Sequence, residues 1–96
     1  MLIDKGVSVG EVVTLKLISG EEMLARYVDE NDKHYKLNKP MVLSMGPQGM
    51  GMIPFAITVD MEKEVKLNRS AVIAIEPTEK QFADAYMQNT TGIKLA

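Results

Sequence analysis

Short runs of alternating apolar and polar residues, separated by only a few turn residues, dominate this sequence. Between Val12 and Ile18, the apolar residues Val13, Leu15 and Leu17 alternate with polar ones. A period of two is typical of a strand with one buried face. Successive strands joined by short turns pair antiparallel, and no stretch between them is long enough for a parallel crossover. The pattern therefore predicts a mainly all-β fold and disfavours a parallel nucleotide-binding sheet.

Further strands are predicted along the chain, each bounded by turn residues. Leu24 and Val28 make the second strand apolar on both faces, so part of its outer face should be covered. Pro40 marks an edge position, a bulge or a bend in the third strand. The alternation does not decide whether 53–67 forms one bent strand or two. The predicted strands after the first are Glu22–Asp29, about His34–Ser44, Ile53–Met61 continued by Val65–Leu67, and Val72–Ile75.

The segment Met45–Met52 interrupts this pattern with three glycines and a proline. Such a composition predicts a mobile loop rather than a regular element. Its methionines favour either of two roles. They form an adaptable apolar contact surface, or they fold back onto the body of the protein.

The C-terminal part changes character. Thr78-Glu79-Lys80-Gln81 fits a capping box, and apolar residues four apart then predict a helix from Glu79 to about Gln88. Gly92 is expected to end it, and Ile93-Lys94-Leu95 forms a short apolar tail. About five short strands followed by one helix predict a small, strongly bent, five-stranded antiparallel barrel with a short C-terminal helix.

Composition sets the class of protein. The chain has 96 residues, 46% apolar and 25% charged, which suits one soluble domain over 1–96, with the barrel over about 12–76 and the helix and tail over about 78–96. The absence of cysteine excludes disulfides and thiolate chemistry. A net charge of −2 gives no support to a strongly basic nucleic-acid-binding globule. The start is too short and polar for a signal peptide, and no apolar run is long enough to span a membrane, so a cytoplasmic location is expected.

No set of catalytic residues is evident, and neither an enzyme nor a cofactor is expected. His34 has no nucleophile in a recognisable motif, and the loop glycines are not followed by the lysine and helix of a phosphate loop. His34 and Asp32 are too few ligands for a metal site. The segment Asp32–Leu37 is the most suggestive, because flat and cationic side chains occur together in single-strand nucleic-acid sites. Alternation alone favours a plain strand, with Tyr35 and Leu37 inside.

The order of motifs resembles the Sm-like (LSm) family over about residues 12–76. The apolar strand Val13–Lys16 is followed by Gly20, and Asp32-Lys33-His34-Tyr35-Lys36-Leu37 matches the Asp-x-His-x-x-Leu segment of the first Sm motif. Asn68-Arg69 before Val72–Ile75 matches the second motif. The C-terminal part, Gln88–Ile93, is similar to small Sm-like proteins of marine T4-like phages, which would place the chain inside a bacterial host.

This resemblance implies a bent five-stranded barrel that forms a homo-oligomeric ring of five to eight subunits through edge strands. It also implies single-stranded RNA binding, with a base stacked on His34, contacts from Asp32 and Lys36, and an arginine near Asn68 and Arg69. The departures are specific. Ala25 stands where the second glycine would be, and lysine replaces the base-reading asparagine at position 36. The Arg-Gly pair is Asn-Arg here, and no N-terminal helix is apparent in Met1–Gly10.

Two functions from different classes therefore remain open. The first is an Sm-like ring that binds single-stranded RNA and acts as an RNA chaperone, with contacts directed to phosphates more than to bases. The second is an oligomeric scaffold without RNA binding, whose methionine-rich segment and C-terminal helix contact protein partners. An enzyme would need a pocket that combines His34 with carboxylates of a neighbouring chain.

Overall fold

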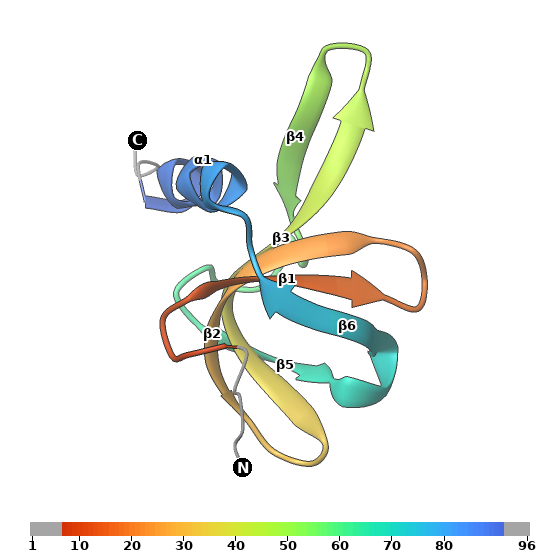
Figure 1. Cartoon of the computed structure of the whole chain (residues 1–96), viewed down its shortest axis with the longest axis vertical. Helices are drawn as coiled ribbons and strands as arrows, with labels where there is room; N and C mark the ends of the chain where they lie inside the picture. Colours follow the sequence, from red (N-terminus) through yellow and green to blue (C-terminus); the bar gives the residue numbers. More distant parts are fainter. Residues whose placement is uncertain (1–6, 92–96) are drawn as a thin grey trace.

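The fold is mostly β, with one α-helix at its C-terminal end (Figure 1). The computed structural model describes residues 7–91. The predicted all-β class is confirmed, although the described residues form six strands where about five were expected. The elements are β1 (Val12–Leu17), β2 (Glu22–Glu30), β3 (His34–Gly46), β4 (Gly49–Pro54), β5 (Glu64–Asn68), the 3-10 turn η1 (Arg69–Ala71), β6 (Val72–Pro77) and α1 (Lys80–Thr91).

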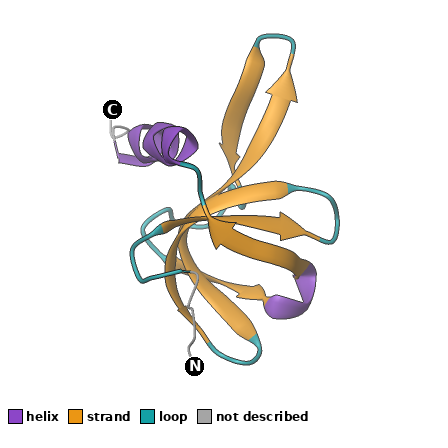
Figure 2. Ribbon diagram, in the orientation of Figure 1, coloured by secondary structure: helices purple, strands orange, loops and turns teal. Residues whose placement is uncertain are grey.

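The strands form one antiparallel sheet in the order β4-β3-β2-β1-β6 (Figure 2). Strand β5 lies off this path and pairs with the first half of β3, while β4 pairs with its second half. The sheet is not closed into a barrel by strand pairing. Its antiparallel order follows from the short turns, as the sequence predicts; in the first of them Gly20 adopts a φ of +107°.

The main core lies on the concave face of the sheet. Strands β1 and β2 each turn every second residue inward, as the alternation predicts. Tyr27 and Tyr35 are buried with these aliphatic side chains, at 8% and 7% exposure. The cluster consists of Val13, Leu15, Leu17, Met23, Ala25, Tyr27, Tyr35, Leu37 and Leu67.

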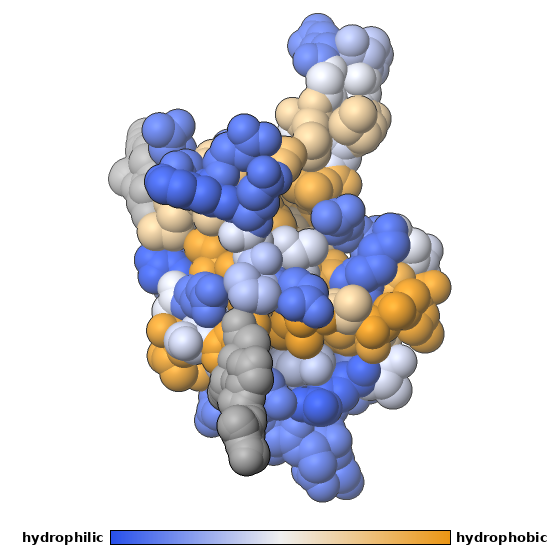
Figure 3. All heavy atoms as spheres, viewed as in Figure 1, coloured by the Kyte–Doolittle hydropathy of each residue, from blue (hydrophilic) through white to orange (hydrophobic). Residues whose placement is uncertain are grey.

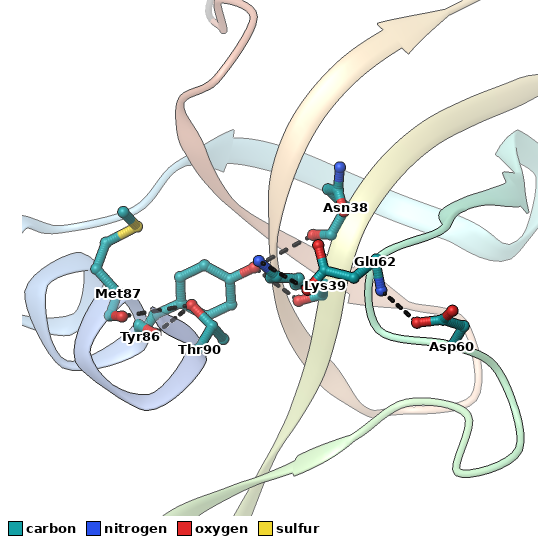
Figure 4. Close-up of polar contacts among 7 residues, drawn as sticks. All are labelled: Asn38, Lys39, Asp60, Glu62, Tyr86, Met87 and Thr90. Carbon is teal, nitrogen blue, oxygen red and sulfur yellow. Dashed lines mark hydrogen bonds and ion pairs between the residues drawn. The ribbon is translucent and has the colours of Figure 1, made fainter. Parts of the chain in front are cut away.

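A second, smaller core forms where α1 packs on the other face of the sheet. Leu24 of β2, Met41 of β3 and Tyr86 of α1 are its buried members, so the expected cover over the outer face of β2 is confirmed at Leu24. The hydroxyl of Tyr86 donates to the carbonyl oxygen of Lys39 at 2.6 Å and lies 3.2 Å from that of Asn38 (Figure 4). This contact anchors the helix to β3.

Helix α1 begins at Lys80, one residue after the predicted Glu79, and ends at Thr91, three residues beyond the predicted Gln88. The predicted capping box is wrong. The hydroxyl of Thr78 pairs with that of Thr14 on β1 at 2.7 Å, which ties the start of the helix to the sheet instead of to its own amides. Tertiary contact has replaced the local cap here.

Strand β3 bends at Lys39 and Pro40, and the bend explains its two partners. Lys39 has a φ of +49°, a conformation that non-glycine residues seldom adopt. Before the bend β3 pairs with β5, and after it β3 pairs with β4. The bend predicted from Pro40 is confirmed, and it turns the β3–β4 hairpin away from the body of the sheet (Figure 1).

The prediction of a mobile loop over Met45–Met52 is wrong. This segment is the end of β3, a turn at Pro47 and Gln48, and most of β4, with Gly46 paired to Gly49. Gly49 has a φ of +111°, which glycine adopts without strain. The glycines and the proline therefore build a hairpin turn rather than preventing regular structure.

The predicted strand Ile53–Met61 is also wrong beyond Pro54. Proline has no N–H for a ladder, and the next amide, of Phe55, donates to Pro40 at 3.0 Å. The chain then runs through turns, in which the side chain of Asp60 accepts from the amide of Glu62 at 2.9 Å. Ile57 is 86% exposed, so the alternation here reflects no buried face. Two strands, β4 and β5, thus answer the question left open for 53–67.

Three predictions lie outside the described residues: the absence of a helix over 1–6, the Gly92 cap and the Ile93–Leu95 tail. Residues 7–10 contain no helix. Within 7–91, no helix has the length and apolar character needed to cross a membrane.

Candidate nucleic-acid interface

Two turns that are distant in sequence meet at one end of the sheet. The amide of Arg69, at the start of η1, donates to the carbonyl oxygen of Lys33 in the β2–β3 turn at 2.9 Å. His34 and Asn68 are register partners across β3 and β5. The fold therefore brings Asp32, His34, Lys36, Asn68 and Arg69 to one region, although they come from segments more than thirty residues apart.

Asn31 organises the β2–β3 turn. Its side-chain oxygen accepts from the amides of Lys33 at 2.8 Å and His34 at 2.7 Å, the geometry of an Asx turn. Its own amide donates to the carbonyl oxygen of His34 at 2.9 Å. Asp32 is exposed in this turn, and His34 is half-buried at the start of β3. Asn31 was not among the predicted site residues, although asparagine before a polar pair is a turn signal.

Arg69 is held in place by two side chains of the sheet. Its Nη1 donates to Glu30 Oε2 at 2.7 Å, and its guanidinium lies 4.7 Å from the centre of the Tyr35 ring. The hydrogen bond to Glu30 raises the pKa of Arg69. The guanidinium is thus fixed in orientation, with about one third of the side chain exposed. Tyr35, predicted inside, is the platform for this arginine.

Glu30 links Arg69 to the buried core. Tyr27 donates its hydroxyl proton to Glu30 Oε1 at 2.7 Å, while Oε2 receives Arg69. Burial, followed by this hydrogen bond, raises the pKa of Tyr27 to about 12. One carboxylate therefore connects the core to the rim of the candidate site.

Strands β3 and β5 present a polar row on their outer faces. His34 and Lys36 alternate with the buried Tyr35 and Leu37, so they point away from the core. Lys36 lies directly opposite Lys66, an arrangement of like charges that disfavours the pair unless an anion lies nearby. Lys36 also approaches Glu64 at 3.9 Å, a weak and exposed ion pair.

A shallow cavity of about 150 Å³ adjoins this row. Its lining residues are Asp29, Glu30, Asn31, His34, Lys36 and Lys66. Lys66 was missed by sequence reasoning. Alternation with Val65 and Leu67 places it outward, but only the register with β3 reveals its position beside Lys36.

Charges of both signs are balanced around the site. The two turns and the strands beside them carry four cations, Lys33, Lys36, Lys66 and Arg69, and four carboxylates, Asp29, Glu30, Asp32 and Glu64. Among them, Arg69 pairs with Glu30 and Lys36 approaches Glu64. Such a surface produces no strong field for drawing in a polyanion. Binding here would depend on close contacts rather than on long-range attraction.

Metal binding finds no support among residues 7–91, where no group of three or more potential ligand side chains comes together. Neither the models of known protein families nor the curated proteins include a match to this chain. The assignment to the Sm-like family therefore stays a prediction that rests on the motifs and on the arrangement of the strands.

Proposed function

We propose that this chain is an Sm-like subunit that forms a ring and binds single-stranded RNA. The strand path β5-β3-β2-β1-β6 supports a bent barrel, because its two end strands are joined only by η1, three residues long. The amide of Ile18 beyond β1 also donates to Ala71 in this link at 2.9 Å. The short link keeps the end of β5 near the start of β6, which favours closure of the path into a small barrel.

Ring assembly is supported by unpaired strand edges with apolar neighbours. Strands β4 and β6 end the sheet, and unpaired edges favour pairing with another chain. Ile53 on β4 is 54% exposed and Ile73 on β6 is 65% exposed. A contact between the two different edges is head-to-tail and closes into a ring when the rotation permits.

The observation that carries the RNA proposal is the meeting of the β2–β3 turn with the start of η1. In this arrangement the His34 ring offers a flat surface for a base, and Lys36 and Lys66 offer two ammonium groups for a phosphate. Arg69 lies at the same end of the sheet, fixed by Glu30 and Tyr35 with part of its side chain exposed, and offers a further cation to the RNA backbone. Asp32 and Asn68 supply polar groups for the base or sugar. Repetition around a ring would multiply weak contacts.

The test is fluorescence anisotropy with labelled ten-nucleotide oligo-U and oligo-A, at 50 and 200 mM salt. We expect binding that weakens with salt, and a several-fold loss in Lys36→Ala, Lys66→Ala and Arg69→Ala. Lys80→Ala is the matched control, because Lys80 lies on α1 with its side chain 87% exposed. Salt-independent binding, or equal losses in all four variants, would refute the site.

A second candidate function is a ring scaffold that contacts proteins. The balanced charge at the turn region and the 76% exposure of Met45 on the β3–β4 hairpin favour it. Replacing 46–51 by a shorter turn should then abolish capture of a protein partner and leave oligomerisation intact. A partner set unchanged by this deletion would contradict it.

A further inference from the structure

A groove of about 550 Å³ lies on the outer face of the sheet, apart from the candidate RNA site. Its lining residues come from the start of α1, the β3–β4 hairpin and the β1–β2 turn. Figure 3 shows apolar residues at the surface between the helix and the hairpin. Its volume falls within the range of about 300–1,000 Å³ that is usual for ligand sites. The groove is lined by Thr14, Lys16, Gly20, Glu21, Glu22, Leu24, Leu43, Met45, Met50, Thr78, Glu79 and Phe82.

The floor of this outer groove is apolar and continuous with the second core. Leu24 is a buried member of that core, and Leu43 packs against it. The register of β3 and β4 places Met45 opposite Met50 on the same face of the hairpin, which extends the apolar strip outward. Met45 is 76% and Met50 47% exposed, so these two flexible side chains are free to pack against a ligand in the groove.

The rim of the outer groove is acidic. Glu21, Glu22 and Glu79 line it against a single cation, Lys16, whose Nζ donates to Gly20 O at 3.0 Å. The hydroxyl of Ser19 donates to Glu21, and this bond lowers the pKa of that carboxyl. Within 7–91 neither Glu22 nor Glu79 has an ion-pair partner. The groove therefore combines an apolar floor with net negative charge at its edge.

We propose that the outer groove binds a short apolar segment of a partner protein that carries lysine or arginine beside its apolar side chains. The acidic rim selects basic neighbours and repels the phosphates of a nucleic acid. Leu43, Phe82 and the two methionines receive the apolar side chains, because methionine adapts its shape to varied partners. This proposal does not depend on RNA binding at the β2–β3 turn.

The test uses a synthetic peptide with Leu-Phe-Leu at its centre and lysine at both ends, and the same peptide with glutamate at both ends. The readout is the methyl signals of ¹³C-labelled methionines, followed by NMR. We expect the lysine peptide to shift the Met45 and Met50 signals and to bind about three- to tenfold more tightly than the glutamate peptide. The double variant Glu22→Gln with Glu79→Gln should remove most of this preference.

Matched variants at exposed apolar residues distinguish binding in the groove from nonspecific hydrophobic binding of the peptide. Met45→Ser should weaken the lysine peptide about three- to tenfold. Ile57→Ser should not, because Ile57 is 86% exposed in the turns after β4 and does not line the groove. Four results would overturn the proposal: no shift of the Met45 and Met50 signals by either peptide, equal binding of both peptides, a shift of these signals by oligo-U, or signals that move with protein concentration alone. The last would show that a second copy occupies the groove. A shift of these signals by oligo-U would likewise assign the groove to nucleic acid.

Discussion

Removing the hydroxyl group of Tyr86 is expected to destabilise the protein, because this group joins α1 to the bend in β3. Tyr86 is fully buried, and its hydroxyl donates to Lys39 O at 2.6 Å, with Asn38 O at 3.2 Å. Tyr86→Phe removes the donor and leaves a shielded carbonyl oxygen with one partner fewer. The expected cost is about 1–2 kcal/mol. For a domain of this size, that corresponds to a fall in Tm of about 5–10 °C.

Urea unfolding followed by circular dichroism at fixed protein concentration measures this cost, and the m-value should not change. Tyr35→Phe is the matched control. The Tyr35 ring lies under Arg69, and within 7–91 its hydroxyl has no hydrogen-bond partner, so the change should stay within about 0.5 kcal/mol. If both variants cost the same small amount, the hydroxyl of Tyr86 does not hold the bend, and the reasoning fails.

Three further predictions concern the core, the hairpin and the candidate site. The pKa of Tyr27 is raised from 10.0 to about 12 in the folded protein. The protonated hydroxyl therefore contributes fully to the free energy of unfolding below pH 10, and this contribution is lost as the pH rises toward 12. Urea unfolding should show a loss of about 1 kcal/mol in the free energy of unfolding by pH 11. Tyr27→Phe should reduce the decline of that free energy with pH. Gly49→Ala should destabilise the hairpin by about 1 kcal/mol because φ is +111°, measured by thermal unfolding; an unchanged Tm would contradict it. Glu30→Gln removes a negative charge beside Arg69 and should raise the affinity for oligo-U about two- to fivefold in anisotropy; weaker binding would argue against the proposed contacts.

The strands that could be predicted from sequence are those whose alternation coincides with burial. Leu15 and Leu17 of β1 face the core, and the period of two locates this strand correctly. The same signal fails at Ile57, because no partner strand lies beside that residue once Pro54 has ended the ladder. Periodicity shows which side chains are apolar. Whether they are buried depends on pairing with another strand, which periodicity does not show.

At the β3–β4 hairpin the error was the reverse: a region that does pair as strands was predicted to be a loop. Gly46 and Gly49 indicate a loop by composition, yet in a hairpin they flank a tight turn. The alternation of Met50, Gly51 and Met52 after that turn is a strand signal that the glycines obscured. A short loop and a hairpin turn have the same glycine- and proline-rich composition. Only the pairing of Met45 with Met50 distinguishes them, and the local sequence does not contain that pairing.

The candidate site could be predicted only as separate segments. The motif around His34 indicated which residues to consider, and the fold brings them near Asn68. The positions of Lys66 and Glu30 depend on the register of β3 with its neighbours, which no local pattern contains. The fixing of Arg69 by Glu30 and Tyr35 is likewise a property of the folded sheet.

The proposed Sm-like ring that carries RNA makes a distinctive prediction about the mass and nucleic-acid content of the particle in solution. The most direct test is light scattering on the purified protein during size-exclusion chromatography, with absorbance at 260 and 280 nm followed across the peak. A particle with the mass of a ring of five to eight subunits, and a raised 260/280 ratio that nuclease treatment lowers, is the predicted result. A ring without nucleic acid would favour the scaffold function, and a monomer would contradict the account.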